Sequence, residues 1–474
     1  MSNESRHAHV CSESRAFSKG SAVNEDSPWR RTRKRFVRLA TFEKWPVVHG
    51  TEFPSQINDI QTGLGKLSIA PEQCVTSNAT SLTDIASLAD AAAATAGFCV
   101  KIMTRDEIAG CPAWAATFAD RRKDHRYYEI LEDTLPDRVE YRYFAIIDQA
   151  ACIRAVQPFF LLDQDILEGL GAEWQTWLAR IRRFVPRFLK TRTLMVGCFA
   201  GEGHLAGSDT VPSGEVAEIL CREIVNLARS CRAQLIVLKE FPTRYRPVLD
   251  CFVRRGFARA PSMPMTVLNI EHDDFDAYMQ NALPRSARWQ LRKKFKATVG
   301  EPLALAVIDD ARDAIDEIYP LYLQVFDRSK FRFEKLTADY FRRLGSDMKD
   351  KTLFFIWRRG EKVVAFSLCM VEGDSLFWEY VGLDYAVALD LHLYYYTIRD
   401  MMNWAIANGY KWLRSTGLSY EPKFRMRHEL DPLDLYARFR PAIPNAIFRL
   451  LLPWIAPARY DKTLRRFANY RDLW

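Results

Sequence analysis

The stretch LFWEYVGL (376–383), together with LHLYYYTIRDMMNWAIANG (391–409) and YKWLRSTG (410–417) that follow it, decides the fold of this chain. The apolar runs at its two ends predict β-strands, and the apolar residues between them recur at helical spacing. Gly409 is typical of a residue that ends a helix. The stretch therefore predicts a strand, a loop, a helix and a second strand.

A second copy of this pattern lies earlier in the chain. LMVGCF (194–199) leads into a Gly-rich loop, and SGEVAEILCREIVNLARSC (213–231) and AQLIVLKE (233–240) follow. Where a strand passes through a loop into a helix, the unpaired N–H groups of the first helical turn point outward and attract anions. Two such units predict a duplicated domain that binds a phosphate-bearing ligand.

Length and composition set limits on the answer. The chain has 474 residues, of which 48% are hydrophobic, enough for two cores. A formal net charge of +8 favours an anionic ligand, such as a nucleotide, CoA, RNA or a membrane surface, without choosing among them. The ten cysteines show neither a CxxC pair nor zinc-ligand spacing. With no signal-peptide pattern and no apolar segment of about 18 residues, we expect a cytoplasmic protein with reduced thiols.

Composition also divides the chain. Residues 1–80 are rich in polar residues, Gly and Pro, which predicts a disordered or loosely ordered extension. We place the first domain at 81–270, with a hairpin over 139–162 and a helix over 173–189, and expect the strand at 263–270 to close it. The second domain then covers 271–474, including a C-terminal extension.

The order of elements from 81 to 440 resembles the GNAT acyltransferase superfamily in its tandem form. It is also similar to FemAB-type and BioF2-like acetyltransferase domains. The stretches that carry the resemblance are LPRSARWQLRKKFK (283–296), residues 379–417 and EPKFRMRHELDPLDLYARF (421–439). The resemblance implies an α/β fold of two tandem GNAT-like domains, each a mixed, mostly antiparallel sheet flanked by helices. It also implies transfer of an acyl group to an amine from acyl-CoA, acetyl-CoA or a carrier-protein thioester, without a metal.

The chain departs from the pyrophosphate signature of that superfamily, Arg/Gln-x-x-Gly-x-Gly/Ala. The first loop, GCFAGEGHLAG (197–207), contains glycines, whereas the second has none between Leu383 and His392. We therefore expect Gly201, Gly203 and His204 of the first loop to contact the phosphates of the donor. His392, which opens the second helix, is a further anion contact or a helix cap.

Amide formation from a thioester sets the chemistry that the residues must supply. The attacking amine must lose a proton, and an N–H group must face the carbonyl oxygen. The resemblance places that N–H group where two parallel strands separate. Glu379, between Trp378 and Tyr380 in the second half, is a candidate base with a raised pKa, or else a solvent-facing strand residue. Glu240, at the end of the strand 233–240 in the first half, is a similar candidate.

Four further residues follow from the resemblance. GNAT enzymes that use a Tyr acid often take it from the region after the second parted strand, which singles out Tyr420 in the second half and Tyr245 in the first. Related domains carry a Lys-containing segment where Lys423 and Arg425 stand, which implies a contact with substrate or phosphate. The alternative is that these two are solvated charges.

Three other possibilities remain open. The basic face of Arg285, Arg288 and Arg292 favours a FemAB-type transferase that takes an amino acid from tRNA. A non-catalytic acyl-CoA-binding protein is the second. The apolar segment 446–458 could contact a membrane or a long acyl chain, or pack as a core helix. The acceptor amine, the acyl chain and the oligomeric state do not follow from the sequence.

Overall fold

The computed structural model describes residues 97–135, 139–165, 190–296, 299–300, 303–329 and 335–474. All of them belong to one compact unit. The predicted extension over 1–80 and the predicted helix over 173–189 lie outside the described residues.

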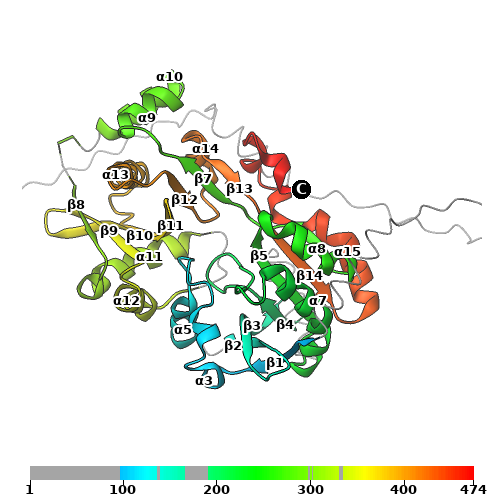
Figure 1. Cartoon of the computed structure of the whole chain (residues 1–474). Helices are drawn as coiled ribbons and strands as arrows, with labels where there is room; N and C mark the ends of the chain where they lie inside the picture. The colour runs from blue at the N-terminus through cyan, green and yellow to red at the C-terminus, as the bar shows by residue number, and fades with distance from the viewer. Residues whose placement is uncertain (1–96, 136–138, 166–189, 297–298, 301–302, 330–334) are drawn as a thin grey trace, which may run out of the picture. The chain divides into compact units, whose positions relative to one another are not determined.

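The first half is built on a seven-stranded sheet with the strand order β1-β2-β3-β4-β5-β14-β6 (Figure 1). Its pairs are antiparallel except for β4 and β5, which run parallel. The strands are β1 (Cys99–Met103), β2 (Val139–Ile147), β3 (Ile153–Asp165), β4 (Lys190–Val196), β5 (Leu235–Pro242), β6 (Ala258–Pro261) and β14 (Leu433–Phe439).

The second half repeats the arrangement with the order β13-β7-β12-β11-β10-β9-β8, in which only β11 and β12 are parallel. The strands are β7 (Met265–Asn269), β8 (Ala304–Ile308), β9 (Thr352–Arg359), β10 (Lys362–Glu372), β11 (Ser375–Leu383), β12 (Trp412–Ser415) and β13 (Glu429–Asp431). Both predicted strand–loop–helix–strand units are present, as β4-α7-β5 and β11-α13-β12, which confirms the predicted fold class.

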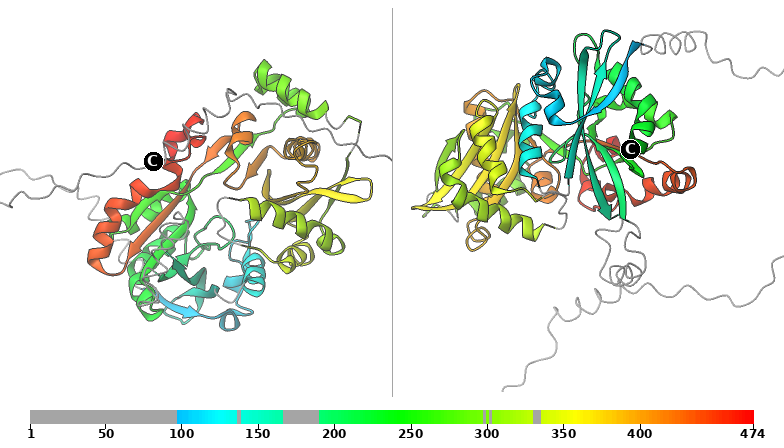
Figure 2. Two further views of the ribbon diagram at one scale, coloured as in Figure 1. Left: turned by 180° about the vertical axis from the view of Figure 1, so that it is seen from behind. Right: turned by 90° about the horizontal axis from the view of Figure 1, so that it is seen from below.

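Helices flank both sheets (Figure 2). Those of the first half are α3 (Arg105–Ile108), α4 (Pro112–Ala115), α5 (His125–Thr134), α7 (Ser213–Ser230) and α8 (Arg246–Arg254). Those that follow are α9 (Phe275–Ala282), α10 (Arg285–Phe295), α11 (Ile315–Arg328), α12 (Ala338–Asp347), α13 (Leu393–Ala407), α14 (Tyr420–Arg425) and α15 (Ala442–Ile455). The apolar face of α7, including Val216, Ile219 and Ile224, is buried as its periodicity predicts.

The two sheets exchange strands. β7 follows β6 in the chain but pairs with β12 and β13 of the second sheet, and β14 returns to the first sheet between β5 and β6. The strand predicted to close the first domain therefore belongs to the other sheet. The reason lies in tertiary pairing, because apolar alternation predicts a strand but does not name its neighbour.

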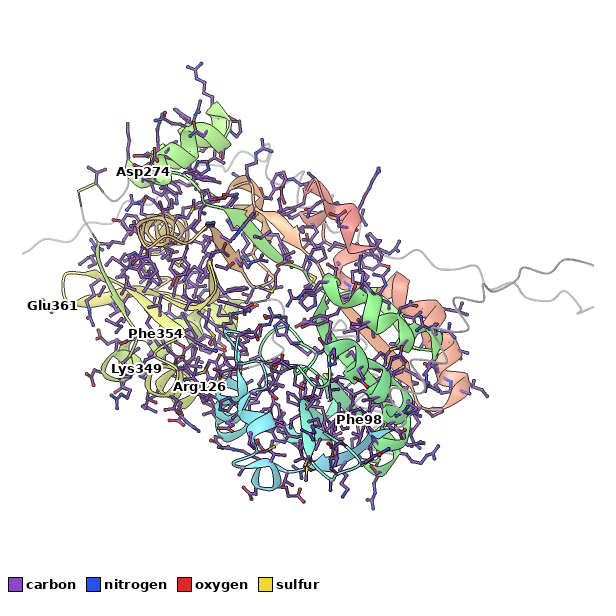
Figure 3. The ribbon with its side chains drawn as sticks, in the orientation of Figure 1. Phe98, Arg126, Asp274, Lys349, Phe354 and Glu361 are labelled. Carbon is purple, nitrogen blue, oxygen red and sulfur yellow. The ribbon has the colours of Figure 1, made fainter. Side chains whose placement is uncertain are left out.

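The halves share one core, in which α5 packs against α12. The hydroxyl of Tyr127 lies 2.8 Å from that of Tyr340, and both rings are buried. At the edge of this contact Arg126, labelled in Figure 3, pairs with Asp124 on its own side and with Asp350 on the other. The halves are thus held together by buried apolar and polar contacts.

Candidate functional site

The parallel strands β11 and β12 separate at their ends. Their pairing stops at Trp378 and Ser415, while β11 continues to Leu383. The Thr416 side chain bridges the start of the gap by donating to the backbone oxygen of Glu379 at 3.1 Å. Among the described residues, the backbone of β11 beyond this point has no strand partner on its β12 side. This is the separation that the sequence predicted for the second half.

A β-bulge in β11 accompanies the separation. Leu368 of β10 pairs with Tyr380 and Cys369 pairs with Trp378, so Glu379 is the extra residue. A bulge reverses the alternation of side chains along the strand. As a result Trp378 and Val381 both pack in the core beneath α13, while Glu379 points toward the first half.

A cavity of about 70 Å³ lies in the gap between the strands. Its wall includes Glu379, Tyr394, Thr416 and Lys423. The Lys423 amine donates to the backbone oxygens of Thr416 at 2.6 Å and Leu418 at 3.0 Å. Burial lowers the pKa of this amine to about 7, so a neutral amine is accessible near physiological pH.

The loop at the end of β12 is strained. Leu418 and Ser419 both have positive φ angles, of 74° and 49°. Non-Gly residues adopt this region at a cost, and such strain clusters at functional sites. The strained turn directs the carbonyl of Leu418 to Lys423 and leads directly into α14.

Two cations from the first half hold the Glu379 carboxylate. Arg122 Nε lies 2.6 Å from its Oε1 and Lys123 Nζ lies 3.0 Å from its Oε2. The same cations bind Glu202, at 2.6 Å from Arg122 Nη2 and 3.2 Å from Lys123 Nζ. All four side chains are buried. Burial opposes ionisation of Glu202, but Arg122 and Lys123 outweigh it and hold its pKa well below the usual range.

His204 extends this network. Its Nε2 lies 3.2 Å from Glu202, and its Nδ1 lies 3.2 Å from a guanidinium nitrogen of Arg244 and 3.4 Å from the hydroxyl of Tyr245. A guanidinium can only donate, so Nδ1 accepts and Nε2–H donates to Glu202. Burial lowers the pKa of the ring, which is consistent with a neutral histidine.

A second cavity, of about 340 Å³, lies between the halves. Its charged lining includes four guanidinium groups and five carboxylates: Arg121, Arg122, Arg244 and Arg414 with Asp120, Glu202, Glu372, Asp374 and Asp431. His204 and Phe377 also line this cavity. Because the charges nearly balance, the cavity suits a polar or zwitterionic molecule rather than a strongly charged one.

In the first half the chain itself fills the gap between the strands. The Gly-rich loop folds back onto β5, where Gly203 N–H donates to the Glu240 oxygen at 3.0 Å. A Cβ at Gly203 would lie 2.5 Å from the Lys239 oxygen, and one at Gly201 would meet the Lys123 amine. The glycines therefore permit close packing of the loop, and the predicted phosphate contact of Gly201 and Gly203 stays a prediction.

The other candidates of the first half have structural partners. Glu240 is a bulge residue with a φ of 57°, and its carboxylate accepts from Lys239 at 2.6 Å and Ser262 at 3.1 Å. Tyr245 lies against His204 and Phe241. Neither residue lies beside the cavity in the second half.

Tyr420 also makes a structural contact. Its buried hydroxyl donates to the Pro264 oxygen at 2.8 Å, which fixes the link between β6 and β7. Burial raises the pKa of this phenol. Two other tyrosines line the gap: Tyr380 of β11 and Tyr394, one of three consecutive tyrosines at the start of α13.

Three basic side chains gather near Tyr395, which follows the cavity residue Tyr394 in the chain. Arg425 is exposed and reaches Gln290 of α10 at 3.3 Å, while Lys294 of α10 lies over the ring of Tyr395. Burial and then Lys294 lower the pKa of His392, whose φ of 49° begins α13. The structure thus brings the predicted residues His392 and Arg425 to the same side as the basic helix α10.

The backbone of the second loop offers little to an anion. Asp384 N–H donates to Val364, Tyr385 N–H to Gln324, and those of Val387 and Ala388 donate back to Asp384. An anion at this loop would therefore contact side chains more than backbone. Among the described residues there is also no group of three or more His, Cys, Asp or Glu arranged to hold a metal ion.

Comparison with known proteins identifies the second half. Residues 285–421 match the family model described as an acetyltransferase (GNAT) domain. The match covers β11, β12 and the gap between them, and it confirms the predicted resemblance and the assignment to the acyltransferases. No curated protein matches the chain.

Several solved structures resemble the tandem GNAT arrangement. FemX is 11% identical over 74% of this chain and 99% of its own, with a TM-score of 0.43. A tandem GNAT protein from the clavulanic acid biosynthesis pathway is 10% identical over 72% and 99%, with a TM-score of 0.40. L-PGS from Bacillus licheniformis is 12% identical over 69% and 95%, with a TM-score of 0.41.

Sequence analysis missed the cations that meet Glu379. Arg122 and Lys123 lie in DRRKDH (120–125), which reads as an ordinary solvated charge run before a helix. Asp124 caps that helix by accepting from Arg126 N–H, and this fixes the two preceding residues in the interface. Only the contact between halves distinguishes them from other basic pairs in the chain.

Proposed function

We propose that the second half transfers an acyl group from the thioester of acyl-CoA to an amine by direct attack. The observation that carries the proposal is the gap between β11 and β12 after Trp378 and Ser415. The gap leaves backbone N–H groups of β11 beside a cavity, where a thioester carbonyl can accept a hydrogen bond as its oxygen gains charge.

The proton of the attacking amine has two acceptors within reach of this cavity. Glu379 carries the carboxylate nearest the bulge, and Lys423 carries an amine with a pKa of about 7. Arg122 and Lys123 orient the Glu379 carboxylate, and a water on it would collect the proton. Tyr394, in the cavity wall, is placed to protonate the leaving thiolate.

The cavity between the halves is the proposed acceptor site. Glu379 separates the two cavities: its own atoms line the smaller one, and its partner Arg122 lines the larger. An acceptor amine in this cavity would bind to the carboxylate of Glu202 or Asp374 before it attacks the thioester. The proposed acceptor is therefore an amine that also carries an anionic or polar group for Arg244 or Arg414.

The phosphates of the donor are assigned to side chains. Lys294, His392 and Arg425 lie near Tyr395, next in the chain to the gap residue Tyr394, and most N–H groups of the loop are already hydrogen-bonded. In enzymes with the pyrophosphate signature, backbone N–H groups attract the phosphates. Here Lys294 and Arg425 would supply the positive charge instead.

The test compares two carboxylates of one network. Glu379→Gln should abolish acyl transfer to a panel of amines, with CoA binding by calorimetry retained. The comparison variant is Glu372→Gln, because Glu372 pairs with Arg121 and Arg122 and lines the proposed acceptor cavity but not the gap; it should weaken use of the amine without abolishing transfer. Full turnover by Glu379→Gln removes this residue from the mechanism, and CoA binding without turnover by the native protein indicates a binding protein.

A second candidate is transfer of an amino acid from tRNA, and α10 favours it. Arg285, Arg292, Lys293 and Lys296 of this segment are exposed, and so is Trp289, with 64% of its surface accessible. An exposed indole among basic side chains can stack on a base while the cations bind phosphates. Loss of activity after RNase treatment of the assay, restored by added aminoacyl-tRNA, would select this donor over acyl-CoA.

A further inference from the structure

Helix α15 exposes an apolar face. Ile443, Ile447, Leu450 and Leu451 are 76%, 54%, 75% and 51% exposed, and their spacing places them on one side of the helix. Exposed apolar groups this close together are uncommon on a protein surface and indicate an interaction site. The views in Figures 1 and 2 place α15 on the outside of the described part of the chain.

The opposite face of α15 is firmly attached. Asn445 donates to the Gly256 oxygen at 2.9 Å and accepts from Phe439 N–H at 3.0 Å. The ring of Phe448 packs edge-on against Phe439, and Leu452 is part of the core. One side of the helix therefore packs against the core, which is one of the two alternatives that the sequence analysis left open. The other side exposes the apolar residues and is held in place by these contacts.

Basic residues are frequent on α15 and in the segments next to it in the chain. The 37 residues from Arg438 to Trp474 contain eight Lys and Arg and two Asp, a net charge of +6, against +8 for the whole chain. Arg449 is exposed on α15 itself. Arg440 bonds the Ala233 and Gln234 oxygens beside the exposed Arg232, and Arg255 precedes the glycine that α15 binds.

These cations are available to an anionic partner. Among the described residues, Arg232, Arg255, Arg440 and Arg449 form no ion pair with a carboxylate. Two carboxylates of α7 and α8, Glu218 and Asp250, are paired with Arg254. An apolar ridge bordered by unpaired arginines matches the interface of a bilayer, where acyl chains lie beneath anionic headgroups.

From this combination we infer that α15 docks on an anionic lipid surface, with Ile443, Ile447, Leu450 and Leu451 inserted and the surrounding arginines at the headgroups. At 14 residues the helix is too short to cross a bilayer and would lie in the plane of the interface. No helix in the described part of the chain has the length and apolar character of a membrane span. The inference does not depend on the proposed acyl transfer.

Sedimentation of the full-length protein with vesicles tests the inference. We expect it to pellet with phosphatidylcholine vesicles that contain phosphatidylglycerol, less with phosphatidylcholine alone, and less again at high salt. Leu450→Ser combined with Leu451→Ser should weaken binding at least about tenfold, because inserted leucines supply the apolar contact. Arg449→Gln should weaken binding about fivefold, and only to the anionic vesicles.

The matched control is Leu389→Ser, since Leu389 is 73% exposed but lies outside α15. It should bind vesicles as the native protein does. Circular dichroism checks that the variants are folded. The inference is overturned if the native protein stays in the supernatant or if the double variant pellets with it. It is also overturned if light scattering shows a dimer that the double variant dissociates, because the face would then bind a second copy.

Discussion

Arg122 Nε donates to Glu379 Oε1 at 2.6 Å, although the two residues are 257 positions apart in the chain. The contact joins a loop of the first half to the bulge of the second, and both side chains are about 2% exposed. A buried guanidinium of this kind is held by its carboxylates, and their combined charge raises its pKa despite burial. The first half thus orients the candidate catalytic carboxylate of the second.

We expect Arg122→Met to destabilise the protein by about 3–5 kcal/mol, because it leaves Glu202 and Glu379 buried with one cation fewer. The control is Arg342→Met, which removes an exposed pair with Asp339 and should cost less than about 1 kcal/mol. Denaturant unfolding of both variants measures the difference. Equal losses would show that the buried network contributes no more than a surface pair.

Stability should rise with pH between about 7 and 10 through Lys423. Its pKa is about 7 in the folded protein because of burial, and about 10.4 when unfolded. In this window the unfolded chain binds a proton that the folded one does not, so stability increases by up to about 1.4 kcal/mol per pH unit. Lys423→Met should remove this slope. Parallel unfolding profiles for native protein and variant would contradict the assignment.

His428 should make the protein sensitive to acid. Both ring nitrogens are buried without a hydrogen-bond partner among the described residues, and burial, with Lys423 nearby, lowers its pKa to about 3. Below about pH 6.5 the ring binds a proton in the unfolded chain but stays neutral in the folded protein, so the free energy of unfolding falls as pH drops toward 3. We expect His428→Met to flatten the unfolding free energy between pH 6 and 4 (roughly one titration window). If the variant and the native protein lose stability equally between these pH values, other groups cause the acid sensitivity.

Gly203→Ala should destabilise the first half without affecting the donor site. The new Cβ would overlap the Lys239 oxygen, a backbone atom that cannot move aside, and we expect a cost of about 1–3 kcal/mol. Gly300→Ala, where no atom lies within 4 Å, is the control. Calorimetry should give an unchanged CoA affinity for the folded variant. A weaker affinity would instead support the predicted phosphate contact of the Gly-rich loop.

Local patterns were sufficient for the elements of the fold. The hairpin over 139–162, the helix end at Gly409 and the paired strand–loop–helix–strand units all lie where the sequence predicted them. Each depends on neighbours within a few residues, which periodicity and Gly positions report directly.

The same local patterns do not predict which groups each side chain contacts. Tyr420 and Glu240 have the residue types and strand positions of candidate acids and bases, yet their polar atoms bond to Pro264 and to Lys239 and Ser262. Glu379 was found from its strand position alone. Which groups would meet its carboxylate depends on how the halves pack, and no local signal reports that.

The amino-acid sequence by itself determined two α/β units, the parting strands of the second and the positive charge near its helices, because these follow from short-range periodicity and composition. Tertiary structure alone decided that β7 and β14 change sheets, that the Gly-rich loop closes the first gap and that Arg122 and Lys123 reach Glu379. Strand pairing and burial of charge depend on contacts between residues far apart in the chain, and they are set only when both halves pack together.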